Sequence, residues 1–245
     1  QSRGLGDVYK RQVYNQALER GVATYVPRLF NKVHTGIDCP VKRAVSPEVI
    51  CRLMTDRKPL PGKLAFSRDL FVLLFLLRGM PFVDLAFLRR CDLQGNVITY
   101  HRRKTSRKLT VVVGKEAMEI IQKYMYAIPD SPYLFPIIQN PGKDEYGQYA
   151  RMLRLQNYRL TQVANILGIR DRLSTYTARH TWATTALRQN YNSSLICDAM
   201  GHSSVKVTET YFQPYRDDEV NRMNSSLITY ILSKKKRGID KKIRS

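Results

Sequence analysis

The spacing of apolar residues is typical of helices along most of the chain and changes in one stretch only. Apolar side chains that recur every three or four residues indicate helices with one buried face. Ser46 and Pro47 form a favourable helix start, because serine caps a helix and proline suits its first position. The predicted helices are residues 13–21, a helix that begins at Pro47, and 63–77, 81–88, 115–126, 150–167, 177–189, 193–200, 205–212 and 217–231.

The exceptional stretch is residues 96–113, where β-branched side chains dominate. Two short runs, Val97 to Tyr100 and Leu109 to Val113, are separated by a basic segment. Such runs around a polar break are typical of a β-hairpin. The predicted fold class is therefore mainly α with a small antiparallel β-sheet (α+β).

The charge of the chain points to a polyanionic partner. Lys and Arg number 41 against 20 acidic residues, which gives a net charge of +21 and a pI near 10.0. Charge alone does not distinguish DNA, RNA, a ribosome or an anionic membrane surface. The longest apolar run, Leu70 to Leu77, is too short to cross a bilayer, so we expect no transmembrane helix and no signal peptide.

Cysteine and histidine spacing gives no support for a metal site or a disulfide framework. We therefore expect no cofactor, and a reducing cytoplasmic environment. The residues concerned are Cys39, Cys51, Cys91, Cys197, His34, His101, His180 and His202. Any phosphoryl transfer would then rely on basic side chains around the phosphate oxygens and on a hydroxyl nucleophile.

Three segments near the C-terminal end carry a recognisable pattern. They are Tyr176 to Thr184 (YTARHTWAT), Met200 to Ser204 (MGHSS), and Tyr211, which follows His202 by nine residues. In order and spacing they closely resemble the C-terminal boxes of the tyrosine recombinase or phage integrase family. The resemblance extends over residues 45–225.

The resemblance implies a role for each matching residue. Tyr211 would be the nucleophile that forms a 3′-phosphotyrosyl link, Arg179 would bind the scissile phosphate, and His202 would hydrogen-bond it. Lys104, in the predicted hairpin, matches the lysine that protonates the 5′ oxygen, although it could also be one of several solvated cations there. Those cations, Arg102, Arg103, Arg107 and Lys108, are candidates for DNA binding.

Two positions depart from the family pattern. Arg78 is the best match to the first conserved arginine, but its acidic follower, Asp84, comes six residues later instead of the usual three. The alternatives are that Arg78 is a helix-capping cation, or that this chain departs from the family's first arginine. Tyr176 stands where many members have histidine, and a phenol cannot act as a base at neutral pH as imidazole does. His180 is expected to pack rather than to react.

The residue patterns and the family resemblance also predict the domain organisation. Residues 1–12 resemble translated sequencing-adapter sequence, and we exclude them as a non-native leader. Residues 13–30 match the end of the family's core-binding domain, 31–45 a linker, 46–232 the catalytic domain, and 233–245 a basic, irregular tail.

The sequence thus predicts a site-specific DNA recombinase that integrates, excises or inverts a mobile element. The resemblance implies double-stranded DNA as partner, a homotetramer on two DNA sites, and no requirement for ATP, metal or membrane. A type IB topoisomerase or telomere resolvase fits less well, because the predicted catalytic domain is small and its boxes are integrase-like. A DNA-binding protein of the same fold with impaired catalysis is the remaining alternative.

Overall fold

The computed structural model describes residues 13–26, 29, 43–212, 215 and 217–242, with side chains through 229. It divides into two compact units, Gln1–Val41 and Lys42–Ser245. In the first unit residues 13–19 are helical, which agrees with the helix predicted at 13–21. The predicted leader and nearly all of the predicted linker lie outside the described residues.

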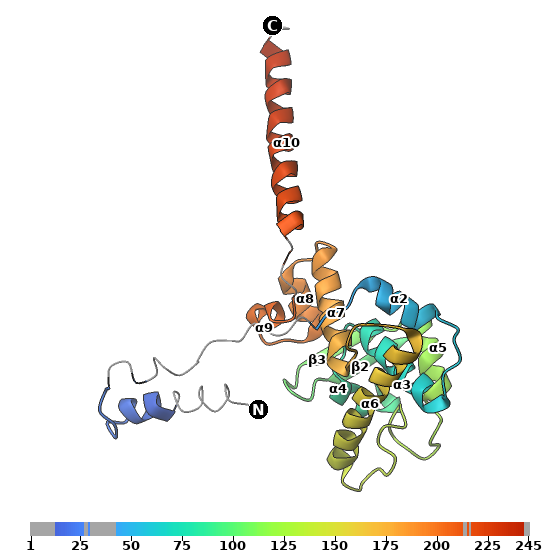
Figure 1. The fold of residues 1–245 in the computed structure, drawn as a ribbon. Coiled ribbons are helices and arrows are strands. Elements are labelled where there is room, and N and C mark those ends of the chain that lie inside the picture. Colours follow the sequence, from blue (N-terminus) through green and yellow to red (C-terminus); the bar gives the residue numbers. More distant parts are fainter. Residues whose placement is uncertain (1–12, 27–28, 30–42, 213–214, 216, 243–245) are drawn as a thin grey trace. The chain divides into compact units, whose positions relative to one another are not determined.

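The second unit is mainly helical with one three-stranded antiparallel sheet, and the predicted fold class is confirmed. Figure 1 shows these elements along the chain. In order they are α2 (Pro47–Thr55), α3 (Gly62–Leu76), α4 (Phe82–Ala86), the 3-10 helix η1 (Arg90–Asp92), β1 (Leu93–Gln94), β2 (Val97–His101), β3 (Lys108–Val112), α5 (Lys115–Tyr124), α6 (Glu145–Leu167), α7 (Thr175–Arg188), α8 (Ser193–Met200), α9 (Val205–Glu209) and α10 (Asp217–Lys242).

Helix α3 forms the centre of the core. It is apolar on nearly every side and packs against α2, α5, α6 and α7. Leu70, Phe71, Leu73 and Leu74 are completely buried. A helix covered all round in this way fixes the positions of the elements that start or end beside it, including the turn after α3 that contacts α7.

The sheet has the order β1-β2-β3, and Val97 pairs with Val112 while His101 pairs with Lys108. Along β2 the side chains alternate, so Ile98 and Tyr100 face the core. The alternation continues past the end of the strand and also buries Arg102. The expectation that Arg102 is a solvated hairpin cation is therefore wrong.

Local capping explains where several helices begin. Ser174 forms a reciprocal capping box with Thr177, so α7 begins at Thr175, two residues before the predicted start. Asp144 accepts a hydrogen bond from the Gly147 amide, so α6 begins at Glu145 instead of 150. Helix α8 has the predicted bounds and is capped by Asn192.

Two C-terminal helices differ in length from the prediction. Helix α9 ends at Glu209, so Tyr211 lies in a turn beyond it. Helix α10 extends to Lys242, and the prediction of an irregular tail is wrong for residues 233–242. Lysine and arginine are good helix formers, which explains why a basic run can continue a helix. No helix in the described part of the chain is both long and apolar enough to span a bilayer.

Candidate active site

Arg179 projects from α7 into the interior and is only 3% exposed. Its Nη2 lies 3.0 Å from the carbonyl oxygen of Met200 and 2.7 Å from Nε2 of His202, and its Nη1 donates to the carbonyl of Gly79. These bonds fix the plane of the guanidinium. They also join α7 to the turn after α3 and to the end of α8.

Gly79 allows this close approach. Its φ of 65° lies in the left-handed region, and a Cβ at this position would lie 3.1 Å from the Cα of Arg179. A side chain here would be strained by the backbone conformation and would push against α7. The turn after α3 therefore requires glycine for Arg179 to reach its position.

His202 is held in the turn between α8 and α9. Its Nδ1 lies 2.8 Å from Oγ1 of Thr208. Burial, followed by the charges of Arg179, Arg102 and Lys104, lowers the pKa of His202 to about 3, so the ring is neutral at neutral pH. Since an arginine can only donate, Nε2 accepts the bond from Arg179, and Nδ1 is the protonated nitrogen that donates to Thr208.

Tyr211 lies against this pair of residues. Its ring centroid is 5.0 Å from that of His202, and the Cζ of Arg179 is 5.4 Å from the Tyr211 ring centroid. The main-chain carbonyl of Tyr211 accepts hydrogen bonds from Nδ1 of His180 and Oγ1 of Thr184, both at 3.2 Å. Helix α7 thus carries the phosphate-binding candidate Arg179, and two other side chains of this helix hold the backbone of the candidate nucleophile.

Tyr176 occupies the first turn of α7 and is 52% exposed. Its ring is nearly parallel to that of Tyr211, with 6.4 Å between the centroids, and the guanidinium of Arg43 is 5.7 Å from its centroid. Burial of its inner part, with Tyr211 adjacent, raises the pKa of Tyr176. The phenol is therefore protonated at neutral pH.

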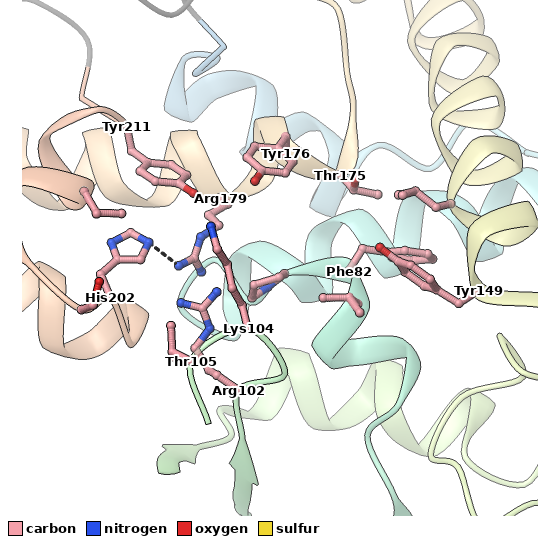
Figure 2. A pocket seen from close by; sticks show the side chains of 15 residues that line it. Phe82, Arg102, Lys104, Thr105, Tyr149, Thr175, Tyr176, Arg179, His202 and Tyr211 are labelled. Atoms are coloured by element: carbon pink, nitrogen blue, oxygen red, sulfur yellow. Dashed lines mark hydrogen bonds between the residues drawn. The ribbon is translucent and has the colours of Figure 1, made fainter. Parts of the chain in front are cut away.

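The β2–β3 hairpin completes the site. Lys104 and Arg102 line a cavity of about 260 Å³ together with Arg179, His202 and Tyr211 (Figure 2). None of the described residues that line this cavity is acidic. A hydroxyl, a neutral imidazole and several cations around one hollow can bind a phosphate and transfer it.

The structure does not place Arg78 in this cavity. Arg78 has a φ of 60°, and its Nη1 donates to the carbonyl of Thr110 at 3.2 Å. Its side chain lines a different hollow, together with Trp182 and Tyr191. Asp84 is matched to the acidic residue that follows the first arginine in the family pattern. In the structure it accepts a hydrogen bond from Arg102 of the hairpin.

The other predicted DNA-binding residues lie on the hairpin. The guanidinium of Arg103 lies over the ring of Phe87 at 3.8 Å. Arg107 forms an ion pair with Asp198 at 3.0 Å and donates to the carbonyl of His202. Lys108 is exposed at the start of β3.

Three supporting residues were not assigned such roles from the sequence. Thr208 orients His202, whereas His180 and Thr184 hold the carbonyl of Tyr211. For His180 and Thr184 the clue in the sequence is that they share a predicted helix with Arg179. For Thr208 no signal is visible in the sequence, because a lone threonine in a short helix is common.

Comparisons with known proteins agree with this picture. The model of the phage integrase family matches residues 44–217. The tyrosine recombinase XerC of Syntrophus aciditrophicus is 24% identical over 232 residues, which cover 84% of this chain and 72% of the relative. The XerC of Thermodesulfovibrio yellowstonii is 26% identical over 167 residues, 62% of this chain and 52% of the relative.

Solved structures share the fold at low sequence identity. The XerA recombinase superposes with a TM-score of 0.57 at 19% identity, covering 89% of this chain and 73% of that one. The Tn1549 transposon integrase in complex with transposon right end DNA gives 0.62 at 13% identity, covering 89% and 78%. The family model matches well over half of the length of this chain. The chain therefore belongs to the phage integrase family, as a site-specific recombinase with a tyrosine-recombinase catalytic domain.

Proposed function

We propose that this protein cleaves and rejoins double-stranded DNA at specific sites through a 3′-phosphotyrosyl link to Tyr211. The observation that carries the proposal is the grouping of Tyr211, Arg179, His202 and Lys104 around one cavity. These residues come from helix α7, the α8–α9 turn, the hairpin and the turn beyond α9. The net charge of +21 supports DNA as the partner.

In the proposed reaction the phenolic oxygen of Tyr211 attacks phosphorus, and the bond from phosphorus to the 5′ oxygen breaks. Arg179 stabilises the negative charge on the non-bridging oxygens, which is the main electrostatic requirement of such a displacement. Lys104 gives a proton to the departing 5′ oxygen. Water or Nε2 of His202, once Arg179 has turned to the phosphate, receives the proton of Tyr211.

Religation reverses these steps. A 5′ hydroxyl of another strand attacks the phosphotyrosine, and Tyr211 leaves with its proton restored. The energy of the original bond is kept in the phosphotyrosine, so the reaction proposed here consumes no ATP. Arg179 and Lys104 provide the charge stabilisation.

We further propose that the recombination serves a mobile element and that it takes place in a homotetramer on two DNA sites. The similarity to a transposon integrase solved with transposon DNA supports the first point. In such an assembly residues 13–30 would belong to a core-binding domain, residues 31–45 to a linker and residues 46–232 to the catalytic domain. Helix α10 would dock onto a neighbouring protomer.

A nicked suicide substrate tests the activity, because loss of a short 5′ fragment prevents religation and traps covalent protein. Wild-type protein should accumulate a protein–DNA adduct, whereas Tyr211→Phe should bind the same DNA with similar affinity and form none. Adducts with the Phe variant would exclude Tyr211 as the nucleophile. Binding without any adduct from wild-type protein would favour the alternative, a catalytically impaired DNA-binding protein.

A further inference from the structure

We propose that Arg102 is the second arginine that binds the scissile phosphate, in the role that the family resemblance implied for Arg78. The inference rests on the proposed function and adds a catalytic residue to it. Arg102 comes from the loop after β2, far in sequence from the helix end where the family's first arginine is expected. Its position relative to Arg179 is the main evidence.

Arg102 and Arg179 converge on a single main-chain carbonyl. Nη1 of Arg102 and Nη2 of Arg179 each lie 3.0 Å from the oxygen of Met200, so these two nitrogens cannot be further apart than twice that distance. Figure 2 shows the Arg102 guanidinium facing the Arg179–His202 pair. Two guanidinium groups this close can bind different oxygens of one phosphate.

The guanidinium of Arg102 is fixed but still has donor capacity. Its Nε bonds to Oδ2 of Asp84 at 3.3 Å, and its Nη1 bonds to the carbonyls of Met200 and Gly201 at 3.0 and 2.9 Å. Its Nη2 has no hydrogen-bond partner among the described residues. A donor that is held in place before the substrate binds is the kind that stabilises a transition state most effectively.

Two neighbours hold Arg102 in this position. The Oδ1 of Asp84 accepts a bond from the Arg103 amide at 3.0 Å, so one carboxylate fixes both the side chain of Arg102 and the hairpin that carries it. Gly201 provides the space: a Cβ there would lie 2.6 Å from the Cδ of Arg102. Asp84 is therefore a positioning residue for the hairpin arginine.

The positive charge around the cavity favours an anion between Arg102 and Arg179. Arg102, Arg179 and Lys104 all act on His202 to disfavour its protonated form, and no acidic residue is among the described residues that line the cavity. Asp84, which accepts a hydrogen bond from Nε of Arg102 and also interacts with the charge of Arg179, does not line the cavity. A phosphate between the two arginines would relieve their mutual repulsion.

Arg78 lacks these features. Its guanidinium bonds to the carbonyl of Thr110 and lines a hollow that includes Trp182 and Tyr191 but neither Arg179 nor Tyr211. To reach the phosphate it would have to give up the bond to Thr110 and leave that hollow. The structure thus favours the hairpin arginine.

Cleavage of matched charged and neutral substrates tests the proposal. One suicide substrate carries the natural scissile phosphate, and the other carries a methylphosphonate there, which lacks the negative charge. On the charged substrate Arg102→Ala should lower the single-turnover cleavage rate by about 10²- to 10³-fold relative to wild type, as loss of one preorganised donor does. On the neutral substrate the loss should shrink to roughly tenfold or less, because the charge that Arg102 compensates is gone. Arg179→Ala should behave in the same way, and Arg57→Ala, an exposed arginine outside the cavity, serves as the matched control.

Several outcomes decide against the proposal. Equal loss on both substrates would show that Arg102 is only structural, and a substrate-dependent loss in Arg78→Ala but not in Arg102→Ala would return the role to Arg78. If Arg102→Ala does not fold, as judged by circular dichroism, Arg102→Lys replaces it, with a smaller loss expected that again shrinks on the neutral substrate. These outcomes leave the nucleophile assignment intact, whereas absence of any wild-type adduct would overturn the proposed function and this inference with it.

Discussion

His180 holds the backbone of Tyr211: its Nδ1 lies 3.2 Å from the Tyr211 carbonyl oxygen, and the two ring centroids are 4.5 Å apart. Because a carbonyl only accepts, Nδ1 carries the proton, and burial lowers the pKa of His180, which keeps the ring neutral. Thr184 donates to the same carbonyl. Tyr211, in a turn beyond α9, is thus held by two hydrogen bonds from α7, the helix that carries Arg179.

Replacing His180 should therefore affect cleavage more than DNA binding. A single hydrogen bond contributes about 0.5–1.5 kcal/mol, so His180→Ala should slow single-turnover cleavage by roughly tenfold at unchanged affinity. Thr184→Val, which removes the second bond with little change in volume, should give a similar but smaller effect. Unchanged rates in the double variant would show that the anchor does not position Tyr211.

Tyr176 offers a test of the departure from the family pattern. Its raised pKa keeps the phenol protonated, whereas a histidine with a pKa of about 6.5 could accept the proton of Tyr211. Tyr176→His should be tolerated or should raise the cleavage rate, with activity that increases as the pH rises through that value. Tyr176→Phe separates the hydroxyl from the ring, and a pH profile identical to wild type in the His variant would contradict the idea.

The low pKa of His202 has a consequence for stability. In the unfolded chain histidine has a pKa of about 6.5, but in the folded protein the pKa of His202 is about 3. Between these values the unfolded state binds a proton that the folded state does not, so falling pH lowers the free energy of unfolding. The slope approaches about 1.4 kcal/mol per pH unit for one proton.

Urea unfolding of wild type and His202→Gln at several pH values measures this effect. The wild type should lose stability faster than the variant as the pH falls from about 6.5 towards 4. The comparison of slopes removes the contribution of carboxylates, which both proteins share. Parallel curves would mean that His202 takes up a proton in the folded state as readily as in the unfolded chain.

The affinity for duplex DNA should fall steeply with salt. Each neutralised phosphate contributes about 0.9 log units of affinity per log unit of salt. Lys108 is exposed on the hairpin, so Lys108→Ala should reduce the slope by about this amount if the hairpin lies on the backbone. Fluorescence anisotropy at a series of salt concentrations measures the slope, and a flat response in the wild type would exclude a charge-driven DNA partner.

Much of this fold could be predicted from local patterns, because each helix or strand depends mainly on its own residues. The bounds of α8 and the hairpin between β2 and β3 follow from apolar spacing and β-branched runs. The start of α7 was missed by two residues, because Ser174 and Thr177 cap the helix with a threonine in place of the usual acidic partner.

The arrangement of the arginines could not be predicted from order along the chain. Arg78 follows an apolar helix as the family pattern requires, but its guanidinium bonds to the carbonyl of Thr110 and lines a hollow that does not include Arg179. The alternation of Ile98 and Tyr100 does predict an inward position for Arg102, a signal that was available in the sequence. What it would meet there depends on α8, about a hundred residues later.

The crowding of cations in the cavity implies a conflict between durability and activity. Burial and the charge of Arg102 both lower the pKa of Arg179, which means that the folded protein without substrate holds this group at a cost. Selection for heat resistance alone would therefore favour a neutral residue at the position of Arg102 or Arg179. Laboratory evolution for thermal stability would tend to lower the cleavage rate unless activity were selected at every round.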